Sequence, residues 1–176
     1  MDVAVDIDGV LANFVQHMIE YAHEKGYHEF PAHWTQWHQY NIPGLNQRFG
    51  KLVDEVSGNP EWWLNIPPHD DAYLSVAPDL YLTSRNVESQ YTLMWLLYHG
   101  FPHAEVVTVE SGEDKPPKME ERGIDVLLDN RFDTYESVNE HEDLKCVLME
   151  RPHNKKARDD SDITVSDTYE FEQMYL

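Results

Sequence analysis

The chain has 176 residues, which is enough for one domain, or for one core and a modest insertion. Aspartate and glutamate (33) outnumber lysine and arginine (13), so the formal net charge is -20 at pH 7. This charge argues against a nucleic-acid backbone or an anionic membrane as the general partner, whereas a small phosphorylated ligand responds to nearby cations more than to the distant surface.

The single cysteine and the lengths of the apolar runs indicate the cellular compartment in which the protein is expected. Cys146 stands in the apolar run 146–149 and has no second cysteine to pair with, so we expect it in the core of a protein from a reducing compartment. No apolar run approaches the ~18 residues of a membrane span, and Asp2 and Asp6 interrupt any signal peptide. We therefore expect a soluble, cytoplasmic protein without a membrane partner. Its oligomeric state is left open, a homodimer included.

Strands and helices are expected to alternate along most of the chain. Short β-prone runs predict strands from Val3 to near Asp6 and over 80–83, 105–109, 124–128 and 145–149. Apolar spacing and stop signals predict helices over 11–22, 45–56, a segment ending at Gly100, a segment from Pro116, 134–141 and a last turn at 169–175. The face of the helix before Gly100 is expected to carry Tyr91, Met94, Trp95 and Tyr98. This alternation predicts an α/β fold with a Rossmann-like parallel sheet and right-handed crossovers.

Residues 27–77 differ in composition from the rest of the chain, and they make up most of the segment 14–77 that precedes the second predicted strand. Four tryptophans fall in this region: Trp34, Trp37, Trp62 and Trp63. We expect a small helical cap inserted after the first strand, with 1–13 and 78–176 forming the α/β core. Aromatic side chains in such a cap more often form a small core than a ligand surface. The alternative is that Phe14, Trp34 and Trp63 contact a substrate, for example by stacking on a nucleobase.

Polar residues follow the predicted strands where each strand ends. They are Asp6 and Asp8 after the first strand, Thr83 at the end of the second, Lys115 after the third and Asp129 after the fourth. Right-handed crossovers place the carboxyl ends of parallel strands along one edge of a sheet, where open α/β sheets bind ligands. We therefore expect these five side chains to converge.

The expected cluster suits phosphoryl transfer. Carboxylates bind Mg²⁺, which takes oxygen ligands and keeps waters that a phosphate can replace. One aspartate can attack phosphorus, and a second, two residues further on, can protonate the leaving oxygen and then activate water. The hydroxyl of Thr83 and the ammonium of Lys115 suit the phosphoryl oxygens, where charge must be stabilised.

Other interpretations of these patterns are weaker. An acidic turn without chemistry explains Asp6 and Asp8 equally well when the motif is taken alone. A Ca²⁺ loop fits poorly, because Gly9 comes too early and no glutamate closes a twelve-residue loop. The histidine pair His99 and His103 is interrupted by glycine and proline, which disfavours a histidine metal site. No glycine-rich P-loop is present, which argues against a kinase.

Taken together, the motifs resemble those of the haloacid dehalogenase superfamily of phosphohydrolases. Asp6-Ile7-Asp8-Gly9-Val10-Leu11 matches its first motif, the strand ending in Thr83 its second, Lys115 its third, and 126–129 with Asp133 its fourth. A helical insertion between the first and second motifs resembles the caps of many members. The first motif, the Leu-Thr-Ser-Arg strand end and the run 150–154 are most similar to the 5'(3')-deoxyribonucleotidase group.

The resemblance implies particular roles at the site. Asp6 would be the nucleophile and Asp8 the general acid and base. The residues expected at the phosphate are Thr83, Ser84, Arg85 and Lys115. Lys118 competes with Lys115 for the lysine role, and a solvated helix lysine is its simpler interpretation. Arg85 and Arg131 can each reach phosphate or pair with a nearby carboxylate.

The resemblance also implies an Mg²⁺ site. Its expected ligands are Asp6, the backbone carbonyl of Asp8, Asp129 and a further carboxylate. Many relatives have two adjacent aspartates in the fourth motif, but Asn130 stands at the second position here. Asp133 is therefore the candidate that completes the set.

We expect an Mg²⁺-dependent phosphomonoesterase that acts through an aspartyl-phosphate, with a (deoxy)nucleoside monophosphate as the most favoured small phosphorylated substrate. The alternatives are a phosphatase for nucleic-acid ends or for a phosphosugar, and a non-catalytic protein that binds phosphate or a partner. An end-processing enzyme needs a basic track, which the charge balance disfavours.

Overall fold

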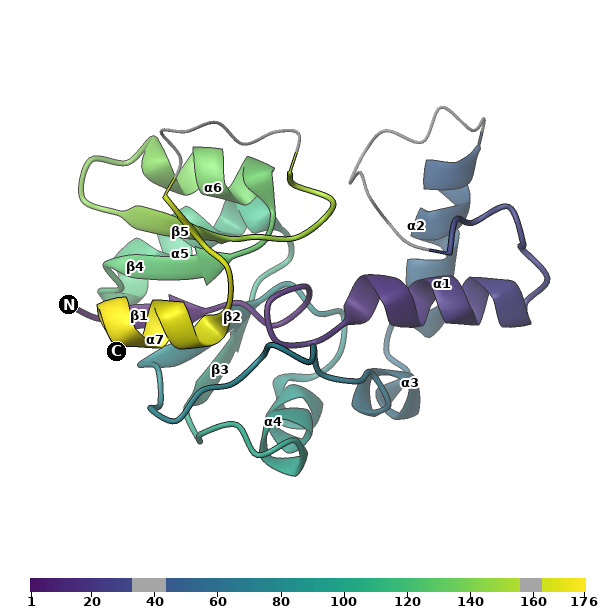
Figure 1. Cartoon of the computed structure of the whole chain (residues 1–176), viewed down its shortest axis with the longest axis horizontal. Helices are drawn as coiled ribbons and strands as arrows, with labels where there is room; N and C mark the ends of the chain where they lie inside the picture. The colour runs from purple at the N-terminus through teal and green to yellow at the C-terminus, as the bar shows by residue number, and fades with distance from the viewer. Residues whose placement is uncertain (33–43, 156–162) are drawn as a thin grey trace.

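A computed structural model provides the structure of the chain and describes residues 1–32, 44–155 and 163–176. Within these residues, a six-stranded parallel sheet runs in the order β3-β2-β1-β4-β5-β6 (Figure 1). The strands are β1 (Val3–Val5), β2 (Leu80–Thr83), β3 (Glu105–Thr108), β4 (Val126–Asp129), β5 (Lys145–Met149) and β6 (Thr164–Val165). The prediction of an α/β fold with a Rossmann-like parallel sheet is confirmed.

The helices form three groups around the sheet. Figure 1 shows the first group beyond the carboxyl end of β1: α1 (Phe14–Glu24), α2 (Leu45–Val56) and α3 (Pro60–Leu64). One face of the sheet packs against α4 (Ser89–Tyr98) and α7 (Thr168–Tyr175). The other face packs against α5 (Lys115–Arg122) and α6 (Phe132–Asn139), and the short 3-10 helix η1 (Gly112–Asp114) leads directly into α5.

Two apolar clusters cover the two faces of the sheet. The cluster on the α5/α6 face contains Ala4, Leu127 and the fully buried Cys146, which confirms the expected core position of the cysteine. The cluster on the α4/α7 face contains Val5 and Leu128 and continues without interruption into the inserted helices. Its members from the insertion include Phe14, Met18, Leu52, Trp62 and Trp63. The insertion therefore shares a hydrophobic core with one side of the sheet.

The central position of β1 determines where Asp6 lies. Val5 pairs with Tyr81 of β2 on one side and with Leu128 of β4 on the other. The amide of Asp6 then donates a hydrogen bond to the carbonyl of Leu128 at 2.9 Å. Asp6 thus continues the strand at the carboxyl edge of the sheet, between the ends of β2 and β4.

The segment after β1 differs from its predicted form. The first helix begins at Phe14 and not at Leu11, because residues 7–12 fold into a tight turn. The amides of Leu11 and Ala12 both donate to the carbonyl of Ile7 at 2.8 Å. Helical spacing of apolar residues is also satisfied by a turn whose apolar side chains are all buried, so the spacing alone could not distinguish a helix from this turn.

The predicted face of α4 is half correct, because Tyr91 and Trp95 pack against the core as expected. Thr92, Trp95 and Leu96 are buried, whereas the side chains of Met94 and Tyr98 are 54% and 83% exposed. Nearly every residue from 93 to 98 is apolar, so the spacing does not single out one face. Trp95 decides the orientation, because its indole fills the space beside Phe101, with ring centroids 5.6 Å apart.

Two short elements were not expected from the sequence. In α3, Pro60 stands in the first turn and the side chain of Asn59 accepts a hydrogen bond from the amide of Trp62. A helix of this length is too short to show apolar periodicity. The two-residue strand β6 pairs with β5 and carries no sequence signal of its own.

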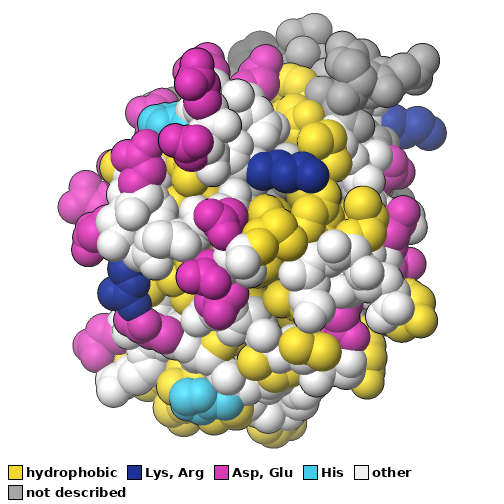
Figure 2. Space-filling model, turned by 90° about the vertical axis from the view of Figure 1, so that its left-hand side faces the viewer, with side chains coloured by type: hydrophobic (Ala, Val, Ile, Leu, Met, Phe, Trp, Pro, Cys, Tyr) yellow, Lys and Arg dark blue, Asp and Glu magenta, His cyan; other side chains and the backbone are white. Residues whose placement is uncertain are grey.

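The surface agrees with the strongly negative composition. Figure 2 shows the side of the molecule that faces left in Figure 1, where acidic side chains are spread among hydrophobic ones and basic side chains are scattered. Among the described residues, no helix has the length and apolar character needed to cross a membrane.

Glu172 of α7 attaches this last helix to the segment that returns from the insertion. Its carboxylate accepts hydrogen bonds from the amide and the hydroxyl of Ser75, both at 2.5 Å, and from the amide of Val76 at 3.2 Å. Burial alone raises the pKa of Glu172, but these hydrogen bonds outweigh it and lower the pKa below its ordinary value. The ionised carboxylate therefore stabilises the fold.

Glu172→Gln should lower the free energy of unfolding by about 1–3 kcal/mol at neutral pH, because an amide cannot accept all three hydrogen bonds. A carboxyl with a depressed folded pKa adds stability above its unfolded pKa and loses it as the pH falls through the folded value. The difference between wild type and variant should therefore shrink below about pH 4. Urea unfolding at neutral and acid pH measures this difference in the free energy of unfolding. Glu142→Gln, on the surface, is the control. A difference that does not change with pH contradicts this role.

Candidate active site

Three neighbouring strands bring three predicted residues to one edge of the sheet. Asp6 follows β1, Thr83 ends β2 and Asp129 ends β4, and these strands are adjacent in the order β2-β1-β4. All three side chains are buried. The expected convergence at the carboxyl edge is therefore present for these residues, and Lys115 joins them from the start of α5 and Asp8 from the turn after β1.

Lys115 lies between two of the carboxylates. Its Nζ is 2.7 Å from Oδ2 of Asp129 and 3.0 Å from Oδ1 of Asp6, and its side chain is buried. The preceding turn holds it there, because Ser111 and Asp114 cap η1 reciprocally. Sequence reasoning left Lys118 as a competitor, but Lys118 is paired with Glu121 on the surface of α5.

Two carboxylates share this one ammonium. Burial and the neighbouring charges together shift the pKa values of Asp6 and Lys115. Burial raises the pKa of Asp6 to about 7, Lys115 opposes the rise, and the charges of Asp129 and Asp8 add to it. Burial lowers the pKa of Lys115, but Asp129 and Asp6 raise it by more, so the lysine stays charged. The site consequently holds a buried excess of negative charge when Asp6 is ionised.

Asp8 faces a different cation. Oδ1 of Asp8 lies 2.9 Å from Nε and 2.8 Å from Nη2 of Arg85, whose side chain is buried. The amide of Arg85 also donates to the hydroxyl of Thr83 at 3.3 Å. Of the two expectations for Arg85, a phosphate contact or a carboxylate pair, the structure contains the pair.

Gly9 allows the loops of β1 and β4 to approach each other. Its φ is +86°, and a Cβ at this position would lie 2.2 Å from Nδ2 of Asn130. Any other residue would suffer both a left-handed backbone and a clash. The glycine of the first motif is thus required both by its backbone conformation and by the close approach of Asn130.

Arg151 holds the same turn from the other side. Its Nε donates to the carbonyl of Gly9 at 2.7 Å and its Nη2 to the carbonyl of Val10 at 2.9 Å. The guanidinium also pairs with Asp71, at 2.7 Å. In the sequence, Arg151 stands out only as part of the run 150–154 that carries the family resemblance. Its burial could not be predicted, because residue spacing does not reveal a buried arginine in a polar loop.

The loop after β4 is supported by residues of the same run. Asn154 donates to the carbonyls of Asn130 and Met149, both at 2.8 Å. Nδ2 of Asn130 lies 2.9 Å from Nε2 of His153. Burial lowers the pKa of His153 to about 4, so the ring is neutral and Nε2 can accept this hydrogen bond.

Asp133, the predicted last metal ligand, stands in the first turn of α6. Its Oδ1 accepts a hydrogen bond from Nε of Arg131 at 3.0 Å, and the amide of Thr134 donates to the same oxygen. The backbone amide of Arg131 also donates to Oδ1 of Asp129 at 2.8 Å. Arg131 therefore links the two carboxylates of the fourth motif, and the metal role of Asp133 stays a prediction.

The candidate substrate residues are placed in part. Phe14 and Trp63 stack with ring centroids 5.6 Å apart and planes inclined by 15°, and both are buried. Trp34 lies outside the described residues. Ser84 and Arg85 line a cavity of about 860 Å³ that also borders Val53 of the insertion.

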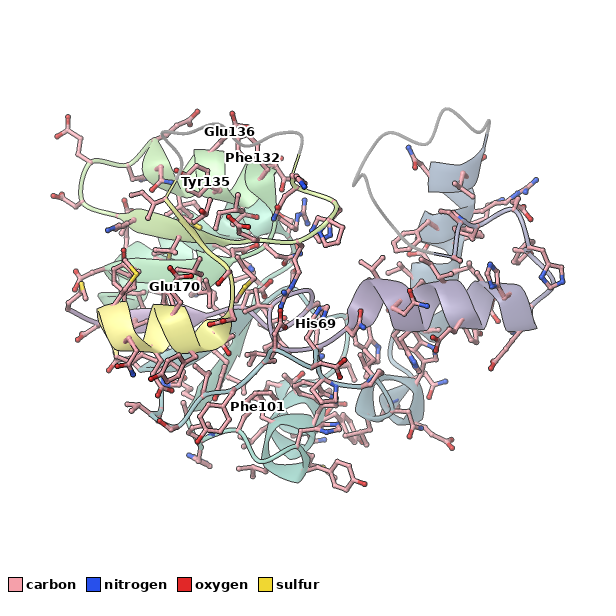
Figure 3. All side chains as sticks on the ribbon, viewed as in Figure 1. His69, Phe101, Phe132, Tyr135, Glu136 and Glu170 are labelled. Carbon is pink, nitrogen blue, oxygen red and sulfur yellow. The ribbon has the colours of Figure 1, made fainter. Side chains whose placement is uncertain are left out.

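A smaller pocket opens beside the turn that carries Asp8. It measures about 250 Å³ and is lined by Gly9, Asn13, Val15, Gln16, His69, Arg151, Pro152 and His153. His69, labelled in Figure 3, comes from the segment that returns from α3 toward β2. Sequence reasoning gave no role to His69, whose pKa is lowered to about 4, chiefly by burial. The space next to the aspartate turn is thus lined by neutral polar side chains, by apolar ones and by the charged Arg151.

The donor atoms at this edge of the sheet determine whether a metal ion can bind there. Among the residues that the structure describes, no three Asp, Glu, His or Cys side chains form a ready group of metal ligands. Oδ1 of Asp6, however, is buried, and the ammonium of Lys115, 3.0 Å away, meets it as an ion pair without the geometry of a hydrogen bond. A buried carboxylate oxygen in a site with excess negative charge fits a hard cation such as Mg²⁺ that keeps several waters.

A scan against protein-family models and a search of curated proteins give no match to this chain. Function is therefore inferred from the residues and their geometry.

Lys115→Met should destabilise the protein strongly, because it leaves two buried carboxylates without their cation. We expect a loss of about 3–5 kcal/mol near pH 8. The loss should be smaller near pH 5, since a carboxyl with a raised folded pKa favours folding while it is protonated and disfavours it as the pH rises. Urea unfolding without divalent ions measures both values, and Lys118→Met is the matched control. An equal loss at both pH values contradicts the shared ion pair.

Proposed function

We propose that this protein is an Mg²⁺-dependent phosphomonoesterase of the haloacid dehalogenase type that acts on (deoxy)nucleoside monophosphates through an aspartyl-phosphate. The observation that carries the proposal is the buried cluster in which Lys115 bridges Asp6 and Asp129 at the end of the central strand. Asp8, two residues after Asp6, is held by its own cation. The two aspartates thus have separate environments, as different chemical roles require.

The proposed reaction has two halves. A carboxylate oxygen of Asp6 attacks phosphorus in line with the leaving group and forms the acyl phosphate. Asp8 gives a proton to the leaving oxygen and then takes one from the water that hydrolyses the intermediate. Lys115 and the hydroxyl of Thr83 are suited to the charge on the phosphoryl oxygens.

Mg²⁺ would be held by Asp6, Asp129 and the backbone carbonyl of Asp8, with Asp133 as the further candidate. When bound, the ion offsets the repulsion between the carboxylates and an anionic substrate. This assignment is supported by the burial of the Asp6 carboxylate and by its raised pKa, which burial chiefly causes and to which the charges of Asp129 and Asp8 add.

The inserted helices are the proposed specificity element. Phe14 begins α1 directly after the aspartate turn, and its ring stacks with Trp63 of α3. Aromatic rings near a phosphate site suit a nucleobase, which stacks with modest selectivity. The substrate is thus proposed to be a small nucleotide handled in the cytoplasm, which is consistent with the single buried thiol of Cys146.

Two other functions are less well supported. A phosphatase for nucleic-acid ends needs a basic track for the backbone, and the net charge is -20. A phosphosugar needs hydroxyl-binding groups, and Asn13, Gln16 and His69 in the smaller pocket favour that alternative over nucleic-acid ends. A non-catalytic phosphate-binding protein would have no need of the Arg85–Asp8 pair.

The nucleophile can be tested by Asp6→Asn, which preserves shape and removes the attacking charge. Turnover of a deoxyribonucleoside monophosphate should fall to the level of buffer while the thermal unfolding curve remains cooperative. Asp8→Asn should lose about 100-fold or more, because proton transfer contributes at least that much. Near-normal turnover by a folded Asp6→Asn protein excludes the covalent mechanism.

The metal can be tested by chelation and by titration. EDTA should abolish turnover, Mg²⁺ should restore it, and Ca²⁺ should replace Mg²⁺ poorly because it prefers a larger and looser oxygen shell. Calorimetric titration should show a greater loss of Mg²⁺ affinity in Asp129→Ala than in Asp133→Ala, since the carboxylate of Asp133 is already bound by Arg131. The opposite order would reassign the ligand, and full turnover in EDTA would exclude the metal.

The specificity element can be tested by Phe14→Leu, which removes a ring and keeps an apolar side chain. The ranking of nucleotides by kcat/KM should change, whereas turnover of p-nitrophenyl phosphate should change much less, because that ester does not depend on a nucleobase contact. The comparison requires soluble, folded protein, since loss of a core aromatic ring can cost about 3–5 kcal/mol. Equal losses on all esters would remove the insertion from substrate choice.

A further inference from the structure

Arg85 is more enclosed than a phosphate-binding arginine needs to be. Its side chain is 1% exposed, and both of its close contacts to Asp8 are made to the same oxygen, Oδ1. Oδ2 of Asp8 is not used by the arginine. The side chain of Asp8 is 20% exposed, so solvent or a substrate can still reach it.

Two tryptophans confine the guanidinium. The Cζ atom of Arg85 lies 4.8 Å from the ring centroid of Trp95 and 5.6 Å from that of Trp63. Each indole is itself fixed, because Trp95 donates to the carbonyl of Ile66 at 2.7 Å and Trp63 donates to that of Val56 at 3.1 Å. One ring comes from α4 beside the sheet and the other from the insertion. A planar guanidinium in such a slot loses little freedom when it binds a carboxylate.

We propose that Arg85 is a positioning residue that aims Asp8 at the leaving group and does not itself bind the substrate phosphate. The inference rests on the proposed function, in which Asp8 is the general acid and base. Arg85 fixes Oδ1, and Oδ2 carries the proton that moves. The carboxyl group is therefore oriented before the substrate arrives.

The proton balance of both steps agrees with this arrangement. As the bond between phosphorus and the leaving oxygen breaks, Oδ2 of Asp8 gives its proton to that oxygen and Asp8 becomes a carboxylate. The guanidinium at Oδ1 stabilises the charge that remains. In the second step a water gives its proton back to Oδ2 as its oxygen attacks the phosphorus of the acyl phosphate. The bond between phosphorus and the Asp6 oxygen breaks, so inorganic phosphate is released and Asp6 is again a carboxylate.

The two possible roles of Arg85 differ in their dependence on the leaving group. A nucleoside is a poor leaving group that needs a proton, whereas p-nitrophenolate leaves without one. A residue that acts through the general acid therefore affects the first ester far more than the second. A residue that binds phosphate affects both esters equally, together with the inhibition by inorganic phosphate.

The experiment compares Arg85→Lys and Arg85→Ala with wild type on a deoxyribonucleoside monophosphate and on p-nitrophenyl phosphate. We expect kcat on the nucleotide to fall about 100-fold or more and kcat on p-nitrophenyl phosphate to fall less than about 10-fold. KM for both esters and inhibition by inorganic phosphate should stay near wild type. Guanidinium ion added to Arg85→Ala should restore turnover of the nucleotide, because it can enter the slot between the two indoles. Arg122→Ala, which removes an arginine paired with Glu105 on the surface, is the matched control and should match wild type.

Equal losses on both esters, with higher KM and weaker inhibition by phosphate, would make Arg85 a phosphate ligand and overturn the proposal. Arg85→Lys retains a cation and serves if the alanine variant does not fold. Wild-type protein that hydrolyses neither ester would instead overturn the proposed function, and the positioning role with it. The wild-type measurement therefore separates the two failures.

Discussion

The buried ammonium of Lys115 is the interaction on which the rest of the site depends. Asp6 and Asp129 end adjacent parallel strands, and two carboxylates so placed repel each other in a region without water. Lys115 offsets that repulsion with two contacts of 3.0 and 2.7 Å. Burial raises the pKa of Asp6 to about 7, and the negative charge that is left over adds to the rise, so a further cation would stabilise the ionised site.

A second set of contacts organises the loops around this cluster. Arg151 binds the turn after β1, Asn154 binds the loop after β4, and Gly9 lets the two loops meet. Arg85 then holds Asp8 from the side of β2. Because each loop is fixed by side chains from another part of the chain, the two aspartates keep different cations and different surroundings. The inserted helices are tied to the same arrangement through the shared core and through Trp63.

Much of the fold could be predicted, because its signals are local. The bounds of α2, β2 and β5 agree with the predicted ranges, and polar residues at strand ends correctly indicated one edge of the sheet. The errors occur where the local pattern was ambiguous. The turn at 7–12 has helical spacing, and α4 is apolar on nearly all sides. The roles of Arg85 and Arg151 depend on contacts between segments that are distant in the sequence, and the spacing of residues along the chain does not reveal such contacts.

Covalent capture of phosphate by Asp6 is the most direct test of the proposed chemistry. Wild-type protein would be quenched in acid during turnover of a deoxyribonucleoside monophosphate with Mg²⁺ and digested, and its peptides would be identified by mass spectrometry. We predict one added phosphoryl group on the peptide that contains Asp6, which is absent from the Asp6→Asn protein and disappears when the substrate is exhausted. Steady turnover with no phosphorylated peptide, or with the phosphoryl group on another residue, would contradict Asp6 as the nucleophile.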